Sequence, residues 1–218
     1  SKKSCLHCVD PSCVSACPVK AMKKDEKTGV VSHNKDACIG CRYCVAACPF
    51  GVPRFTYDSA TPVISKCQLC QHRWPEGKYA ACAEVCPTGA TLFGKVSDIK
   101  AEIARRKALK PGTPTQFPRG RLGGPDQSYE APVAKYVDHV YGEKEVGGTQ
   151  MMMLAGVSFE KLGYPALPQT SFASQSETLQ HTLYGGLVLP VAFLGALTWV
   201  AKRNVKPEDG EQGDSHGA

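Results

Sequence analysis

Twelve cysteines, grouped in three runs that each end in Cys-Pro, are the residues of this chain best suited to chemistry. The runs are Cys5, Cys8, Cys13 and Cys17; Cys38, Cys41, Cys44 and Cys48; and Cys67, Cys70, Cys82 and Cys86. The second run has the C-x2-C-x2-C-x3-C-P spacing of a [4Fe-4S] ligand set, whose fourth cysteine ligates a neighbouring cluster. These thiolates predict electron-transfer chemistry.

The spacing follows from the needs of a four-iron cube, which takes one thiolate for each iron. Two-residue gaps let a tight loop curl over one cube, with its backbone N–H groups free to bond the sulfurs. The proline after the fourth cysteine turns the chain away from a regular helix. We therefore expect two clusters that exchange their fourth ligands, the first held by Cys5, Cys8, Cys13 and Cys48 and the second by Cys38, Cys41, Cys44 and Cys17.

The third run differs from the other two in the long insertion between its second and third cysteines. Taken alone, its spacing would also suit a four-cysteine zinc site. Its Cys-Pro ending matches the other runs and favours iron, while clustered quartets argue against a disulfide framework. We expect Cys67, Cys70 and Cys82 to hold a third cluster, with Cys86 as its fourth ligand or as a ligand of a fourth cluster.

Composition and charge limit what else the chain could do. With 21 Gly, 16 Pro and 8% aromatic residues in 218, it suits a loop-rich protein with a partly inorganic core. The formal charge of +6 would be cancelled by three clusters of about −2 each. We expect no nucleic-acid partner, since no stacking aromatic-and-basic module is visible. No phosphate loop, G-x-S-x-G or H-E-x-x-H motif is present, so the chain is not expected to be an enzyme by itself.

The elements that position the cysteines form an internal repeat within residues 1–50. Each copy is a cysteine loop, a short helical turn carrying the third and fourth cysteines, and a short strand. Lys27-Thr28-Gly29 predicts a hairpin turn, with Val30 and Val31 opening the return strand. The pattern predicts an α+β fold of tandem bacterial ferredoxin-like modules, forming a cluster-binding region over residues 1–96.

Residues 97–180 are expected to pack on the cluster-binding region. Ser97 can cap a helix over about 98–109, which Pro111-Gly112 would end. The Pro/Gly-rich stretch 111–132 predicts an irregular strap. Residues 149–159 predict a buried strand, in which three methionines pack rather than bind metal.

An uncharged stretch at 183–200 approaches the ~20 residues that cross a bilayer as a helix. Tyr184 and Trp199 lie near its ends, as interfacial aromatic residues do. We expect a transmembrane anchor at 181–203, the alternative being a buried helix of a soluble protein.

The charges after this stretch predict its orientation. Lys202 and Arg203 follow at once, so the positive-inside rule places the C-terminus in the cytoplasm and the clusters in the periplasm. Residues 204–218 are polar and acidic, and we expect a disordered cytoplasmic tail there.

The cysteine runs CLHCVDPSCVSACPV and CIGCRYCVAACPFGVP are typical of the four-cluster ferredoxin subunits found in formate dehydrogenases and dimethyl sulfoxide reductases. More specifically, YGEKEVGGTQ at 141–150 and the segments HTLYGGLVLP and WVAKRN resemble the HybA-like periplasmic iron–sulfur subunits of hydrogenase-2-type [NiFe] hydrogenases. The resemblance covers essentially the whole chain. It implies a subunit that carries electrons between the hydrogenase small subunit and a quinone-reactive integral membrane subunit.

The chain departs from this family in one respect, because the family has four cysteine runs. The missing run is the first, and residue 1 is Ser with no export signal before it, which fits a truncated chain. In the family the first run exchanges fourth cysteines with the run corresponding to Cys67–Cys86. The resemblance therefore implies that Cys86 ligates a fourth cluster shared with the missing segment, which also completes the third cluster. Local closure by Cys86 is the alternative.

Two alternative functions stay open. One is the equivalent subunit of a formate dehydrogenase or other molybdenum oxidoreductase, and the more remote one is a zinc-stapled membrane adaptor.

His7, between two cysteines, is expected to hydrogen-bond near a cluster rather than ligate iron. His181 is expected to be an interfacial polar residue at the membrane boundary.

Overall fold

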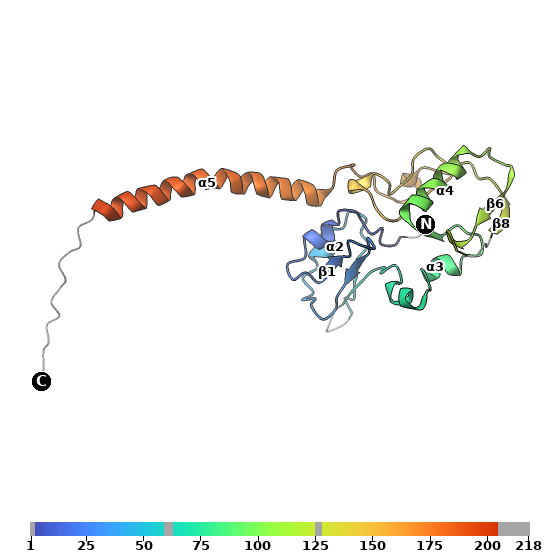
Figure 1. The fold of residues 1–218 in the computed structure, drawn as a ribbon, viewed down its shortest axis with the longest axis horizontal. Helices are drawn as coiled ribbons and strands as arrows, with labels where there is room; N and C mark the ends of the chain where they lie inside the picture. Colours follow the sequence, from blue (N-terminus) through green and yellow to red (C-terminus); the bar gives the residue numbers. More distant parts are fainter. Residues whose placement is uncertain (1–2, 59–62, 125–127, 205–218) are drawn as a thin grey trace, which may run out of the picture. The chain divides into compact units, whose positions relative to one another are not determined.

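The structure, a computed structural model, describes residues 3–58, 63–124 and 128–204. It divides into two compact units, Ser1–Ser174 and Gln175–Ala218. The first carries all twelve cysteines on short helices, two-stranded sheets and loops, and the second contains most of one long helix (Figure 1). This confirms the expected α+β, loop-rich fold. From residue 205 onward the predicted tail lies outside the described residues.

The repeat of the first two cysteine runs is built on a hairpin between two short helices. Its elements are α1 (Ser12–Ser15), β1 (Met22–Lys24), β2 (Val31–His33) and α2 (Tyr43–Ala47). Strands β1 and β2 pair antiparallel around the predicted turn, where Gly29 takes a left-handed φ of 69°.

One detail of the predicted repeat is wrong. Cys17 and Cys48 lie just beyond α1 and α2 rather than within them. The proline that follows disfavours helical backbone in the preceding residue, and Cys48 is accordingly extended (φ −80°, ψ 111°).

The core of this repeat contains cysteines as well as hydrocarbon. Met22, Val31, Cys44, Phe55 and Ile64 are buried together, the last two from the paired strands β3 (Arg54–Phe55) and β4 (Ile64–Ser65). The half-buried residues packed against them are Cys13, Val14, Cys17, Cys38 and Val45. The interior of the repeat is therefore lined partly by thiols.

The third run folds on different elements. Its insertion forms a 3-10 helix, η1 (Gln71–Glu76), followed by α3 (Ala81–Glu84) and β5 (Leu92–Phe93). Strand β5 pairs in parallel with β7 (Gly120–Arg121). Trp74 of the insertion packs edge-on against Phe93, which fixes η1 against β5.

Helix α4 (Val96–Ala108) begins earlier than predicted. Lys95 occupies its N-cap position without a side-chain cap, and Ser97 lies inside the first turn, donating to Asp98 instead. The expected Ser97 cap is therefore wrong.

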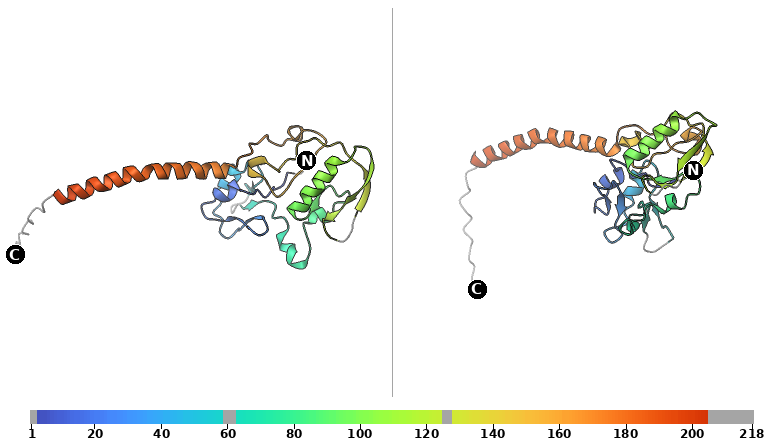
Figure 2. Two further views of the ribbon diagram at one scale, coloured as in Figure 1. Left: turned by 45° about the horizontal axis from the view of Figure 1, so that its top comes forward. Right: turned by 45° about the vertical axis from the view of Figure 1, so that its right-hand side comes forward.

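The expected irregular strap is also wrong, because β6 (Pro114–Pro118) and β8 (Ser128–Pro132) form an antiparallel pair. The pairing is stabilised from one face, where Phe117 of β6 is buried under the guanidinium groups of Arg105 and Arg106 of α4. Both views of Figure 2 show α4 beside these strands.

The predicted buried strand at 149–159 is not formed. Thr149 and Met153 make only isolated bridges, to Cys8 and Tyr141 respectively. Around them the chain is curled by left-handed glycines and the 3-10 helices η2 (Glu145–Gly147) and η3 (Phe159–Leu162), which cannot continue a ladder. A second core forms here from Leu6, Tyr141, Phe159 and Tyr164.

Helix α5 (Phe172–Asn204) has 33 residues, and its most apolar stretch is exposed. By length and composition it is the helix, among those described, that could cross a membrane. Its last turn carries Lys202 and Arg203.

Candidate iron–sulfur centres

The first group of thiols combines three cysteines of run one with one of run two. Burial raises the pKa of Cys8 to about 12, and the neighbouring thiols of Cys5, Cys13 and Cys48 add to this effect. Burial likewise raises the pKa of Cys13 to about 12, with Cys5 and Cys48 again contributing. The structure thus brings together the four residues predicted for the first cluster.

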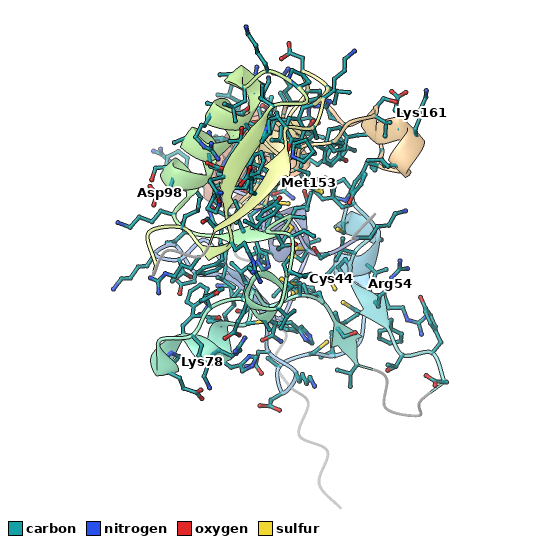
Figure 3. The ribbon with its side chains drawn as sticks, turned by 90° about the vertical axis from the view of Figure 1, so that its right-hand side faces the viewer. Cys44, Arg54, Lys78, Asp98, Met153 and Lys161 are labelled. Carbon is teal, nitrogen blue, oxygen red and sulfur yellow. The ribbon has the colours of Figure 1, made fainter. Side chains whose placement is uncertain are left out.

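The second group has the reciprocal composition. Burial raises the pKa of Cys44, followed by the effects of Cys17, Cys38 and Cys41. All four cysteines line one cavity, together with Met22, His33, Arg42 and Ile64 among others. Sulfur atoms gather in the part of the molecule where Cys44 is labelled (Figure 3).

Each of the two groups supplies four thiols, one for each iron of a cube. Among the described residues, no three His, Cys, Asp or Glu side chains lie close enough to hold one metal ion. A cube instead separates its thiolates, because each binds a different iron atom. The exchange of Cys17 and Cys48 between clusters stays a prediction that this arrangement supports.

The three C-x2-C loops share an unusual backbone conformation. The residue before the second cysteine is left-handed in each, with φ of 50° at His7, 70° at Gly40 and 52° at Leu69. This conformation directs backbone N–H groups inward, and the Leu69 N–H donates to Cys67 Sγ at 3.4 Å. Left-handed backbone costs a residue with a side chain about 1–2 kcal/mol, and such strain is typical of functional sites. The third run thus repeats the loop geometry of the first two.

Cys86 has an environment of its own. Burial raises its pKa, but hydrogen bonds from the backbone of Thr91, from the Thr88 hydroxyl and from the backbone of Thr88 and Ala90 outweigh burial and lower the pKa to about 7. The Thr88 hydroxyl lies 3.7 Å from the sulfur. These donors favour a thiolate, the form that binds iron. Which cluster Cys86 serves stays a prediction.

Two buried histidines have hydrogen-bonding capacity that clusters would use. The Val31 N–H donates to Nδ1 of His7 at 3.0 Å, which leaves the proton of the neutral ring on Nε2. Burial, and then the charge of Lys66, lower the pKa of His7 to about 4, so the ring is neutral. Nε2 of His7 and Nε2 of His33 are both buried without a partner in the described part of the chain.

Buried side-chain nitrogens are normally hydrogen-bonded. The sulfurs of a bound cluster are acceptors that could satisfy these two nitrogens. The donor set of each group therefore fits a [4Fe-4S] cluster. His33, which lines the second group's cavity, was not among the residues predicted from the sequence. Its position two residues after Val31 on β2 puts both side chains on one face of the strand, and that signal could have found it.

The first cysteine loop is held by a distant segment of the chain. The Val9 N–H donates to the Gly148 carbonyl at 2.9 Å, while the N–H groups of Gln150 and Met151 donate to the Leu6 carbonyl at 3.1 and 3.2 Å. These partners lie in the segment 141–151, which contains the stretch YGEKEVGGTQ (141–150) that resembles hydrogenase-linked proteins. We call it the loop clamp.

Comparison with known proteins agrees with this geometry. The 4Fe-4S dicluster domain family matches residues 1–96. The chain is 48% identical over 219 residues to the hydrogenase-2 operon protein HybA of Escherichia coli O157:H7, covering 99% of this chain and 66% of HybA. It is 42% identical over 111 residues to the protein NrfC of Escherichia coli K12, covering 50% of this chain and 49% of NrfC.

A further relative is the iron–sulfur subunit of the nitrate-inducible formate dehydrogenase of Escherichia coli K12, 30% identical over 202 residues, with 92% of this chain and 59% of that subunit covered. The chain thus spans about two thirds of the length of HybA and less of the others. The dicluster match confirms the expectation of [4Fe-4S] clusters, and their number stays a prediction. This chain contains the dicluster domain and is similar to HybA over 99% of the chain's own length, so it belongs to the HybA-like iron–sulfur proteins.

Proposed function

We propose that this chain is a non-catalytic subunit that carries electrons through [4Fe-4S] clusters between a [NiFe] hydrogenase and a quinone-reactive integral membrane subunit. The observation that carries the proposal is the pair of reciprocal cysteine groups, within a chain that is 48% identical to HybA over 99% of its length. In the clusters we assign, Cys5, Cys8, Cys13 and Cys48 hold the first, and Cys38, Cys41, Cys44 and Cys17 the second.

When bound, each cluster supplies a site that takes up and releases one electron. The protein shields these sites, since Cys44 is buried and most other cysteines are half-buried. Cys41 is exposed, and so are Ile39 and Tyr43 beside it. The second group thus has an edge at the surface, where a redox partner can approach closely.

The third run continues this row of sites. The Cys67 thiol acts electrostatically on Cys5 of the first group, so the two sites lie near each other. We propose that Cys67, Cys70 and Cys82 hold a third cluster, and that Cys86 completes it or serves a fourth. An iron count on the purified chain separates these possibilities, because four further irons accompany a fourth cluster.

We propose that the clusters lie on the periplasmic face of the inner membrane. Helix α5, long and apolar enough to span a bilayer, would be the anchor and would lie beside the membrane partner. Lys202 and Arg203 in its last turn support a cytoplasmic C-terminus.

Anaerobic purification with associated subunits tests the function. We expect visible absorption near ~400 nm that bleaches on reduction, together with a nickel–iron enzyme in the same complex. A colourless protein holding stoichiometric zinc would overturn electron transfer. A molybdenum enzyme in place of the nickel–iron one would favour the formate dehydrogenase type of complex. Two relatives of this chain are named as iron–sulfur subunits of formate dehydrogenases.

A further inference from the structure

Lys66 places an ammonium group where the first two cysteine runs meet the third. It directly precedes Cys67, and its Nζ donates to the Cys67 carbonyl at 3.0 Å. The same Nζ donates to the Val31 carbonyl of β2 and lies 3.9 Å from the sulfur of Cys5. One side chain therefore contacts the first cluster's ligand, the hairpin and the third cysteine loop.

The charge of Lys66 acts on several groups inside the repeat. Burial raises the pKa of Cys5, and Lys66 is the strongest influence opposing this rise. The lysine also lowers the pKa of His33, where burial is again the larger cause. These effects reach from the first group of thiols to the wall of the second group's cavity.

No carboxylate neutralises this ammonium within the described residues. The ion pairs found there involve other lysines and arginines, such as Lys24 with Glu26 and Lys78 with Glu76. The hydrogen-bond acceptors of Lys66 are two neutral carbonyls and one sulfur. Its positive charge is therefore left to interact with the thiolates around it.

We propose that Lys66 is a positioning residue of the electron path, whose uncompensated charge raises the reduction potential of the first cluster and whose contacts hold the Cys67 loop beside that cluster. The proposal rests on the proposed electron-transfer function. An electron added at the first group gains Coulomb attraction to a nearby ammonium, and a half-buried pair is only partly screened. A cluster's surrounding charge is one of the determinants of its potential.

The contacts of Lys66 also indicate which cluster its charge affects most. Because Nζ contacts Cys5 directly, the first cluster should respond most to the loss of the charge. The second group has no cysteine among the hydrogen-bond acceptors of Lys66, so its potential should respond less. The lysine would thus raise the potential of the first cluster relative to that of the second.

The test is an EPR-monitored redox titration of the full chain, purified anaerobically with its clusters. In Lys66→Met we expect a downward shift of one midpoint potential, belonging to the cluster whose signal changes in Cys13→Ser. Lys66→Arg keeps the charge and should retain the wild-type potential. Lys24→Met is the matched control, since Lys24 donates to a carbonyl of the same repeat, at Val9, but to no cysteine.

Iron content and the bleachable absorption are measured in parallel, so failure of the proposed function is distinguishable from failure of this inference. Unchanged potentials in an iron-replete Lys66→Met protein would refute the role of the charge. If Lys66→Met loses its clusters, Lys66→Gln, which keeps a donor but not the charge, is titrated instead. Loss of clusters from both neutral variants would show a purely structural lysine and would also overturn the proposal.

Discussion

At the scale of single residues, the Cys-Pro endings explain how the fourth cysteine of each run can reach the thiols of the other run. Cys17 and Cys48 leave their helices because a proline follows, and each joins the thiols of the other run. The residue before the second cysteine of each C-x2-C loop has a left-handed backbone conformation, which turns backbone N–H groups toward the sulfurs. Local strain and local chain reversal are thus both used to surround a cluster.

The reciprocal exchange predicts which variants behave alike. Cys48→Ser should alter the same EPR signal as Cys13→Ser, although Cys48 belongs to the run of Cys44. Cys17→Ser should instead alter the signal affected by Cys44→Ser. Spectra of the four variants at equal iron content decide the matter, and a Cys48→Ser spectrum matching that of Cys44→Ser would contradict the exchange.

At the scale of elements, the loop clamp (residues 141–151) connects distant parts of the first unit. It binds the first cysteine loop through main-chain bonds. Its own shape depends on Thr149, whose hydroxyl lies 2.8 Å from the carbonyl oxygens of both Gly142 and Met151 and shares its one proton between them. Leu6, between the first two ligands, is buried against Tyr141 of the same segment. The clamp therefore stabilises a ligand loop that has no regular secondary structure of its own.

Gly142 is the position at which the clamp is most easily damaged. It is left-handed (φ 93°), and an added Cβ would collide with the Met151 carbonyl oxygen and the Thr149 hydroxyl. Gly142→Ala should therefore cost more than the ~1–2 kcal/mol of left-handed strain alone. Gly112→Ala is the control, because Gly112 is also left-handed (φ 86°) but has open space around it. Thermal unfolding measures both, and equal losses would argue against a tightly closed clamp.

Helix α4 is held by a half-buried carboxylate. Glu102, with its side chain 10% exposed, accepts from Arg105 and Arg106 at 2.7 Å each. Burial raises its pKa, but these charge-assisted bonds outweigh burial, so the pKa lies below its usual value. The stabilisation is complete above the unfolded pKa of about 4.3 and is lost as the pH falls through the lower folded pKa.

Glu102→Gln should accordingly lower the free energy of unfolding by about 1.5–3 kcal/mol, since two bonds to charged groups are weakened. The difference from wild type should stay constant from pH 8 to about pH 5, where the carboxylate is ionised in both states. Glu130→Gln, at an exposed strand position, should change little. A difference that fades between pH 8 and pH 5 would be inconsistent with a lowered pKa.

At the scale of the whole molecule, the clusters are part of what the fold encloses. Four cysteines belong to the core of the repeat, and the strands around them are only two or three residues long. So little regular structure supplies limited stability without the inorganic groups, and the free energy of cluster binding is also folding free energy.

Removal of iron should therefore unfold much of the first unit. Treatment with an oxidant and a chelator is expected to reduce its far-UV circular dichroism and to open sites within residues 3–124 to protease. Helix α5 should remain helical in detergent, because its most apolar stretch is exposed and long enough to insert into a micelle. An iron-free protein with unchanged dichroism and protease resistance would show that the polypeptide holds its fold alone.

The membrane association of the chain should depend on α5 alone. A chain ending at Ser174 loses little of the first unit's core, since Ala173 is the one buried residue of α5 among those described. Expressed without partner subunits, it should leave the membrane fraction, whereas a chain ending at Asn204 should stay. A chain ending at Ser174 that still sediments with membranes would locate the anchor elsewhere.

Much of this protein could be predicted from local patterns. Ligand type, loop spacing, the β1–β2 hairpin and the apolar length of α5 each depend on a few neighbouring residues, and each was recognisable. Two of the predictions that failed, at 111–132 and 149–159, concern segments whose conformation depends on partners elsewhere. Phe117 of β6, for example, is buried under Arg105 and Arg106 and packs against Tyr129 of β8.

The sequence by itself determined the chemistry of the chain, because thiolates at these spacings suit four-iron cubes whatever surrounds them. Only the tertiary structure decided what surrounds each cube. It brought Lys66 to Cys5 across 61 positions of sequence, placed His33 on a cavity wall and closed the loop clamp over Leu6. Such contacts have no local signature, because they arise when separate elements pack to bury the same thiols.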